Sequence, residues 1–411
     1  MAKPRSKKTR RRAASDRIDD RVTILDHPSR RSPIIPLEII GMIMDEYVAG
    51  ESDVKRLSRT LGRLAQSSRF LLADAERRLY SVVKFVVGSP AAQKIASVLR
   101  SRTAKYVRTL EISNYGPALR RGRSTASNVS ALPFSLMTAL RHLEVKFAPC
   151  ELFEPGTDIN CELFDLLRDQ LPENILHSFV CRRALAASHL IFLDRHPNLK
   201  SLTLENIYTE IQPAEPDAHD FARLTNVVEM SVTDVDETSQ SYYFIKRSEL
   251  RYLTFTRIFS IPRDWASHAM HLRVLDVMRI TLDQSALERV VDCSPQLQLL
   301  LFTLCDSPKT NPFDVLYRLE RLEALVIMEK NLFATYTCSV VPKDDDLRFK
   351  TLHTVLIMSK YSAAFEYCRA TGVAHMTDES DVAVGGLLGF VSEWKAKQIR
   401  LIQNGHVEQS A

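Results

Sequence analysis

Apolar residues at positions 1, 4 and 6 of a six-residue stretch return through most of the chain. This pattern begins at Val107, Leu140, Leu199, Val227, Leu250, Leu272, Leu297, Leu322 and Leu352. From Leu199 onward, successive copies begin 22 to 30 residues apart, and residues 175–180 read as a degenerate copy in the longest earlier gap. Because strand side chains alternate between two faces, each copy predicts a short strand with one apolar face. Residues 181–196 and 285–293 have helical spacing, which predicts helices between the strands.

These units predict one elongated array, because a single strand and helix can bury their apolar faces only against the neighbouring unit. The pattern and its period resemble those of leucine-rich repeats. The regular form carries Asn or Cys at the ninth position of each unit, where this chain has Ile207, Val235, Ile258, Ile280 and Cys305. The predicted fold class is therefore α/β, an irregular leucine-rich-repeat solenoid in which parallel strands alternate with helices.

A different pattern, apolar residues at helical spacing, occupies residues 35–80. Its three series are Ile39, Ile43 and Tyr47, then Val54, Leu57, Leu61 and Leu64, and finally Leu71, Ala75 and Leu79. Pro36 and Glu38 suit the first turn of a helix, where a missing N–H costs nothing and an acid faces the positive helix end. Ser67 and Ser68 are predicted to cap the third helix. The sequence thus predicts three short helices, a unit too small to bury much core alone.

Three stretches of this helical unit resemble the F-box family. They are Ile-Pro-Leu-Glu-Ile-Ile-x-x-Ile at residues 35–43, Leu-Ala-Gln-Ser-Ser-Arg-Phe at 64–70 and Arg-Arg-Leu-Tyr at 77–80. Ile35 replaces the family's opening Leu, and Phe70 stands near its customary Trp. A predicted strand after Tyr80, a helix started by Pro90 and the first repeat also resemble the layout of the large fungal, basidiomycete-type F-box families.

In the F-box family, the box docks on a Skp-type adaptor and through it on a cullin ubiquitin ligase. The resemblance implies a set of adaptor-binding residues. These are Pro36, Leu37, Ile39, Ile40, Ile43, Leu64 and Phe70. The spacing of the residues alone indicates only a small helical docking unit, and a helical cap that closes the repeat array is the alternative.

Charge separates a basic tail from the rest of the chain. Residues 1–31 contain eleven Lys and Arg against four Asp, a net charge of +7, so the remaining residues sum to −2. The sequence predicts a disordered tail at 1–34, the F-box-like domain at 35–80, the repeats at 81–380 and a capping helix with a short tail at 381–411. The basic tail suits a nuclear-import signal, a phosphate-binding arm or a solvated segment. Nucleic acid is disfavoured as a partner of the folded part.

No constellation of residues indicates catalysis, a cofactor or a metal. Twelve glycines in 411 residues are too few to favour a nucleotide-binding loop, and Gly385 to Gly389 lack P-loop spacing. Asp344, Asp345 and Asp346 are consecutive acids of a solvated loop, and no Gly-x-Ser-x-Gly elbow is present. Seven widely spaced cysteines predict reduced thiols in an intracellular protein, nuclear or cytoplasmic, and no apolar run suits a membrane span or a signal peptide.

The side chains expected on the concave face of the array change character along it. They are polar in the units that begin at Leu199 and Val227 and turn apolar in the later ones. A target-binding patch is predicted at Tyr252, Arg257, Met278, Arg279, Leu299, Leu301 and Met328. The competing expectation is that residues 382–402, an amphipathic helix with Trp394, cap the last repeat or cover this patch.

These observations predict a non-enzymatic protein without cofactors. The resemblance implies a substrate-recognition subunit of a Skp-cullin-F-box ubiquitin ligase, in which the box binds the adaptor and the repeats bind a target protein. The alternative is a leucine-rich-repeat scaffold that has a helical cap and no ligase partner.

Overall fold

The structure is a computed structural model of the whole chain. It describes residues 37–51, 53–67, 69–114, 128–146, 159–182, 185–204, 207–208, 224, 226–235, 249–259, 265–304, 312–329, 351–352, 354–359, 364–368, 373–377 and 392–401. The chain divides into two units, Met1–Val54 and Lys55–Ala411. The predicted basic tail, the three consecutive aspartates and the glycine cluster at 385–389 lie outside the described residues.

The three helices predicted over residues 35–80 are present. They are α1 (Leu37–Gly50), α2 (Val54–Ser67) and α3 (Arg69–Leu79). Glu38 lies in the first turn of α1, and Arg77 and Arg78 lie in the last turn of α3, so each charge opposes the partial charge of its helix end. Ser67 does not cap α3, because it lies inside α2 and its Oγ donates to the carbonyl of Leu64 at 2.9 Å. Ser68, the other predicted cap, lies outside the described residues.

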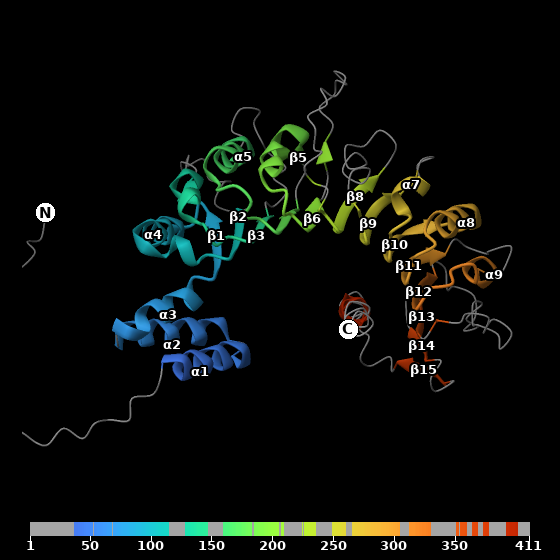
Figure 1. The fold of residues 1–411 in the computed structure, drawn as a ribbon, viewed down its shortest axis with the longest axis horizontal. Coiled ribbons are helices and arrows are strands. Elements are labelled where there is room, and N and C mark those ends of the chain that lie inside the picture. The colour runs from blue at the N-terminus through green and yellow to red at the C-terminus, as the bar shows by residue number, and fades with distance from the viewer. Residues whose placement is uncertain are drawn as a thin grey trace, which may run out of the picture. The chain divides into compact units, whose positions relative to one another are not determined.

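The repeats form one 13-stranded sheet (Figure 1). Its strands in order are β1 (Val82–Val87), β2 (Thr109–Asn114), β3 (His142–Lys146), β4 (Ser178–Cys181), β6 (Ser201–Leu204), β8 (Glu229–Val235), β9 (Tyr252–Phe259), β10 (Val274–Leu282), β11 (Leu299–Leu304), β12 (Ala324–Glu329), β13 (Thr354–Ser359), β14 (Ala364–Cys368) and β15 (Val373–Thr377). Pairing is parallel from β1 to β13. Every predicted repeat strand is confirmed, including the degenerate one at β4.

Two strands at the end of the sheet were not predicted. β14 and β15 pair antiparallel with β13 and with each other, and neither carries the repeat pattern. Outside the main sheet, β5 (Leu185–Ala186) pairs with β7 (Ile207–Tyr208). The helix predicted over residues 181–196 is wrong in its first part, because β4 and β5 occupy it and a 3₁₀ helix follows at Ala187–Arg195.

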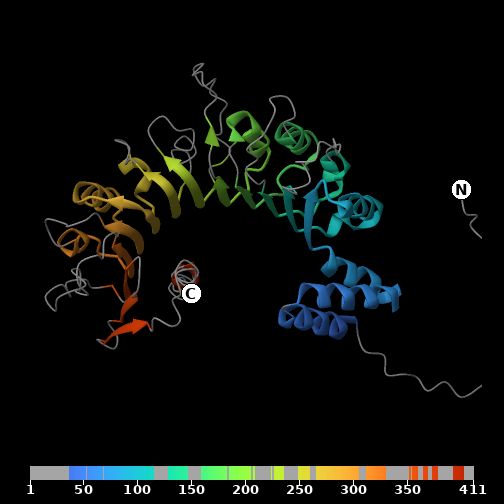
Figure 2. The same cartoon turned by 180° about the vertical axis from the view of Figure 1, so that it is seen from behind.

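Helices connect the strands on the convex side of the sheet, as Figures 1 and 2 show from opposite directions. They are α4 (Pro90–Val98), α5 (Ile159–Gln170), α7 (Trp265–Ala269), α8 (Gln284–Cys293) and α9 (Phe313–Leu316), with shorter helical turns at η1 (Leu99–Thr103), η2 (Ala104–Tyr106), η4 (Asn128–Ala131) and η5 (Phe134–Leu136). Side-chain hydrogen bonds cap the first turn of two of these helices. Ser89 Oγ accepts from the Ala92 N–H at 3.2 Å before α4, and Asp283 Oδ1 accepts from the Ala286 N–H at 2.7 Å before α8.

The main core lies between the sheet and these helices. In each repeat, the apolar residues at positions 4 and 6 point into it, as Leu202, Leu253, Leu275, Leu300 and Leu325 illustrate with at most 1% exposure. Burying a large apolar side chain stabilises the fold by roughly 1.5–3 kcal/mol, and the neighbouring repeat supplies the covering surface. The fold is an α/β leucine-rich-repeat solenoid, as the sequence predicts.

Candidate functional site

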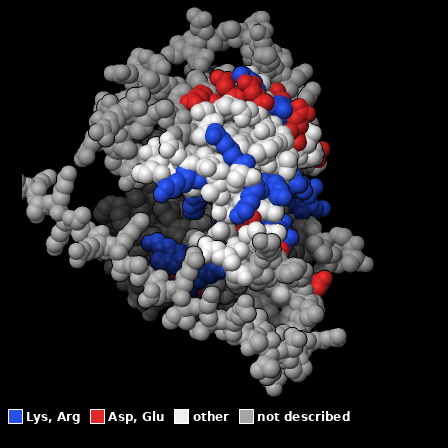
Figure 3. Space-filling view, turned by 90° about the vertical axis from the view of Figure 1, so that its left-hand side faces the viewer, with Lys and Arg blue, Asp and Glu red and all other residues white. Residues whose placement is uncertain are grey.

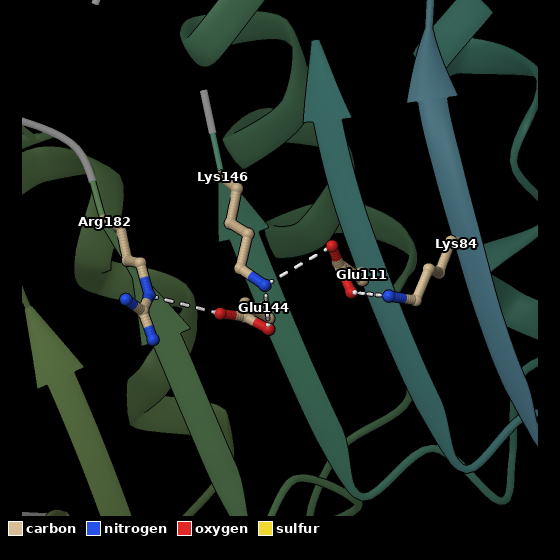
Figure 4. Close-up of polar contacts among 5 residues, drawn as sticks. All are labelled: Lys84, Glu111, Glu144, Lys146 and Arg182. Atoms are coloured by element: carbon tan, nitrogen blue, oxygen red, sulfur yellow. Dashed lines mark ion pairs between the residues drawn. The ribbon is translucent and has the colours of Figure 1, made fainter. Parts of the chain in front are cut away.

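A row of charged side chains crosses the concave face of the sheet, the side away from the helices, at β1 to β4 (Figure 4). Lys84 Nζ lies 3.2 Å from Glu111 Oε2, and Lys146 Nζ lies 3.3 Å from Glu111 Oε1. Lys146 Nζ also lies 2.9 Å from Glu144 Oε2, and Arg182 Nε lies 3.3 Å from Glu144 Oε1. Parallel register aligns Lys84, Glu111 and Glu144 across three strands. The ammonium group of Lys146 contacts both carboxylates, so the charges of the row alternate in sign.

Glu111 and Lys146 in this row stay charged at neutral pH. Burial raises the pKa of Glu111, but hydrogen bonds from Lys84 and Lys146 outweigh it, and the pKa lies below the usual 4.5. The hydrogen bond to Glu144 raises the pKa of Lys146. The cations of these ion pairs are 38–70% exposed, so the pairs contribute little to stability.

Replacing Lys146 with glutamine is expected to raise the pKa of Glu111 toward 4.5, because one of its two cationic partners is removed. The free energy of unfolding should fall by less than about 1 kcal/mol. A pH titration of the Glu111 side chain by NMR measures the first effect. Arg182→Gln is the matched control, since Arg182 pairs with Glu144 and not with Glu111. An unchanged pKa of Glu111 in Lys146→Gln would contradict the arrangement.

The concave face of the later repeats is apolar and covered by the chain itself. Its buried residues, here the concave cluster, are Val274, Met278, Leu299, Leu301, Ala324, Val326, Leu356 and Trp394. Trp394 belongs to a helix at residues 392–401, which lies on the side of the sheet opposite α7, α8 and α9 (Figures 1 and 2). Of the two expectations for this patch, coverage by the C-terminal segment is the one that the structure shows.

A polar contact fixes this helix beside the concave cluster. Lys395 Nζ donates to Asp276 Oδ2 at 2.7 Å and to Thr254 Oγ1 at 2.9 Å. Asp276 Oδ1 also accepts from the Met278 N–H at 3.1 Å. The side chains of Lys395 and Asp276 are only 21% and 15% exposed, so their ion pair is shielded from solvent on most sides.

The predicted target-binding residues have different environments. Leu299 and Leu301 are 0% exposed and Met278 is 8% exposed, so the expectation that they face solvent is wrong: Trp394 packs on the cluster they form. Tyr252 and Met328 are partly buried against the same cluster. Arg279 is exposed on β10, and the side chain of Arg257 lies outside the described residues. The contact between Lys395 and Asp276 was missed, because no local pattern links two residues so far apart in the sequence.

The predicted adaptor-binding residues are partly described. On α1, Ile39 is 44% exposed, Ile43 is 59% exposed, and Ile40 is half-buried. Leu64 on α2 is half-buried. Pro36 and the side chains of Leu37 and Phe70 lie outside the described residues.

One apolar residue of α1 was missed by the sequence prediction. Met42 is 66% exposed, and its spacing of three from Ile39 and one from Ile43 puts all three on one side of the helix. Helical periodicity could have found it. Ile39, Met42 and Ile43 form an exposed apolar strip, here the α1 strip.

Positive charge is concentrated next to the start of the sheet. Residues 55–108 contain 13 Lys and Arg and two Asp and Glu, a net charge of +11, whereas residues 109–411 contain 31 and 39, a net charge of −8. Arg59 and Arg63 of α2 and Lys94 of α4 are exposed. Viewed from the side on which β1 and α4 lie, Lys and Arg side chains lie across the middle of the described surface, and Asp and Glu side chains gather at its top (Figure 3). The net charge of the folded residues is close to zero, although the two charges are separated along the chain. This separation favours anionic partners at residues 55–108.

The sequence matches no protein-family profile and no curated protein. Among solved structures, it is similar to TLR13 in its complex with ssRNA13, with 15% identity and a TM-score of 0.40; the match covers 69% of this chain and 37% of the TLR13 chain. An internalin, inlF of Listeria monocytogenes, has 14% identity and a TM-score of 0.33, with 66% of this chain and 82% of the internalin covered.

A third similar structure is a leucine-rich-repeat protein of Leptospira interrogans, with 13% identity and a TM-score of 0.26, covering 69% of this chain and 78% of that one. The repeats, their register and their core give the chain the fold of a leucine-rich-repeat solenoid. None of the helices in the described ranges combines the length and apolar character required to cross a membrane.

Proposed function

We propose that this protein is the substrate-recognition subunit of a Skp-cullin-F-box ubiquitin ligase. The α1 strip carries the proposal, because Ile39, Met42 and Ile43 are 44%, 66% and 59% exposed within the stretch that resembles the F-box opening. Adjacent exposed apolar side chains typically mark an interaction site. In this proposal the helical unit binds a Skp-type adaptor, the repeats bind the target, and partner subunits perform ubiquitin transfer inside the cell, in the nucleus or cytoplasm.

The geometry of the α1 strip suits a groove on the adaptor. Side chains at i, i+3 and i+4 project from one side of a helix, the arrangement by which an amphipathic helix binds a hydrophobic groove. Complete burial of an exposed isoleucine contributes roughly 1.5–3 kcal/mol, and a partner that buries the exposed 44% of Ile39 and 59% of Ile43 gains about half of this from each. The proposal therefore depends on two side chains that are about half exposed in the free chain.

Replacing Ile39 and Ile43 together with alanine is expected to weaken binding of a Skp-type adaptor from the same species by at least about tenfold, because apolar contact area is lost. Affinity is measured by titrating the purified full chain with the adaptor. Both residues are exposed, so the midpoint of thermal unfolding should change little. Glu46→Ala, an exposed position on the same helix, is the matched control.

Equal adaptor affinity in the folded double variant and in the original chain would overturn the proposed role of the α1 strip. Absence of adaptor binding by the original chain would leave the second candidate, a repeat scaffold with a helical cap. The replacements at Ile35 and Phe70 of residues customary in the F-box favour that candidate.

A further inference from the structure

We propose that the concave face of β9 to β13 is a binding site for an amphipathic helical peptide in which an aromatic residue is followed directly by a basic one, and that residues 392–401 occupy this site as an intramolecular ligand. The inference rests on the proposed role of the repeats as the target-binding part, and it identifies the class of target. It does not depend on adaptor binding.

The site is a local feature of the sheet. At positions 3 and 5 of the repeat, β6 has Ser201 and Thr203, both half-buried polar residues. The same positions carry Leu299 and Leu301 on β11, where both side chains are fully buried. This change to apolar residues occurs on the strands that Trp394 covers. The apolar surface is therefore matched to an aromatic occupant.

The occupant contacts the site through one side only. Trp394 is buried, Lys395 and Ile399 are half-buried, and Ile399 packs against the concave cluster. On an α-helix these three positions lie within 140° of one another. Glu393 and Lys397 are exposed on the opposite side. A separate peptide could present this amphipathic pattern equally well.

Asp276 makes the site favour a ligand that carries a positive charge. Its carboxylate is 15% exposed, and besides the Met278 N–H it contacts the ammonium group of Lys395 at 2.7 Å. A ligand without a cation at this position would leave a largely buried carboxylate without its ion-pair partner. The site thus selects lysine or arginine directly after the aromatic residue.

The helix at residues 392–401 is not an optimal ligand for the site, so a competing ligand could replace it. The Nε1 atom of Trp394 is buried without a hydrogen-bond partner in the described part of the structure, so burial of this N–H weakens the binding of the helix. Being part of the same chain, the helix competes through its effective concentration, and it needs little intrinsic affinity to stay bound. A target that keeps the cation and whose aromatic side chain buries no unpaired N–H, such as phenylalanine, would displace it.

The test uses the full chain and a fluorescent synthetic peptide of residues 390–403, with binding followed by anisotropy. The original chain should bind the peptide weakly, because its own helix occupies the site. The full-chain variant Trp394→Ala with Lys395→Ala should bind it at least about tenfold more tightly, because the internal competitor is weakened. Lys397→Ala in the chain is the matched control, since Lys397 is exposed on the other side of the helix, and it should behave as the original.

A charge exchange tests the contact directly. A peptide carrying Lys395→Glu should lose at least about tenfold in affinity for the released chain and regain it when the chain also carries Asp276→Lys. If Trp394→Ala with Lys395→Ala does not fold, Lys395→Glu alone releases the helix by repulsion from Asp276 and serves in its place. Peptide affinity that is equal for the original and released chains, or insensitive to Asp276, would overturn the inference. Adaptor titration of the same variants separates this failure from failure of the proposed ligase role.

Discussion

Leu301→Asp is expected to lower the free energy of unfolding of the repeats by about 4 kcal/mol or more. Leu301 is 0% exposed between neighbouring strands and the helix that carries Trp394. Truncating such a buried leucine alone costs roughly 2–5 kcal/mol, and a carboxylate without a partner in the same place adds a desolvation penalty. Urea unfolding followed by circular dichroism measures the loss.

Thr203→Asp is the matched control for this change. Thr203 holds the same repeat position on β6 but is half-buried, so a carboxylate there keeps contact with water. We expect a change below about 1 kcal/mol at this site. If the two variants lost equal stability, residues 392–401 would not cover Leu301 in solution, and the concave cluster would be an open face.

The fold was predictable because the repeat pattern states which strand positions face the core. Leu202, Leu253 and Leu300 at position 4 point into the main core in three different repeats. The pattern does not indicate whether solvent or another segment covers the concave face of the sheet. Positions 3 and 5 alternate with the core residues whether water or a helix covers them, so the burial of Leu301 depends on a segment nearly a hundred residues further along the chain.

The sequence did not predict some details of the helices and strands, because the local sequence there is compatible with more than one arrangement. Helical spacing places Val98 on the same apolar stripe of α4 as Ile95 and Leu99, but Val98 is 37% exposed. Ala92 and Ala96 are buried instead, because small residues allow α4 to lie close to the sheet. β14 and β15 were missed because antiparallel pairing at the end of the array needs no repeat motif.

The charged row on β1 to β3 could have been found from the sequence. Glu111 and Glu144 both hold position 5 of their repeats, so parallel register places them side by side. Two like charges at adjacent positions demand a cation between or beside them, and Lys84 and Lys146 supply it. The Lys395 contact with Asp276 had no such signal, since it joins residues 119 apart.

His196 is expected to make the stability of the repeats depend on pH. The side chain is 1% exposed and packs against Phe192, with ring centroids 6.2 Å apart. Its backbone is fixed by hydrogen bonds from the His196 N–H to the Leu193 carbonyl at 2.8 Å and from the Leu199 N–H to the His196 carbonyl at 2.9 Å. Burial, assisted by the positive charge of Arg195, lowers the pKa of His196 from 6.5 to about 4.

The sign of the effect follows from the lowered pKa. The unfolded chain binds a proton at His196 near pH 6.5, whereas the folded chain resists protonation down to about pH 4. The stability is therefore fully present above pH 6.5 and is lost progressively as the pH falls from there to 4. Between pH 7 and pH 5 the free energy of unfolding should drop by roughly 2 kcal/mol from this residue alone.

Urea unfolding of the full chain at pH 7 and pH 5 measures this drop, and His196→Phe tests its origin. A phenyl ring fills the site without a titrating nitrogen, so the variant should lose most of the difference between the two pH values. His271→Asn removes an exposed histidine and should keep the full difference. If His196→Phe retains the drop and His271→Asn abolishes it, the protonation that destabilises the repeats occurs at the surface and not in the core behind Phe192.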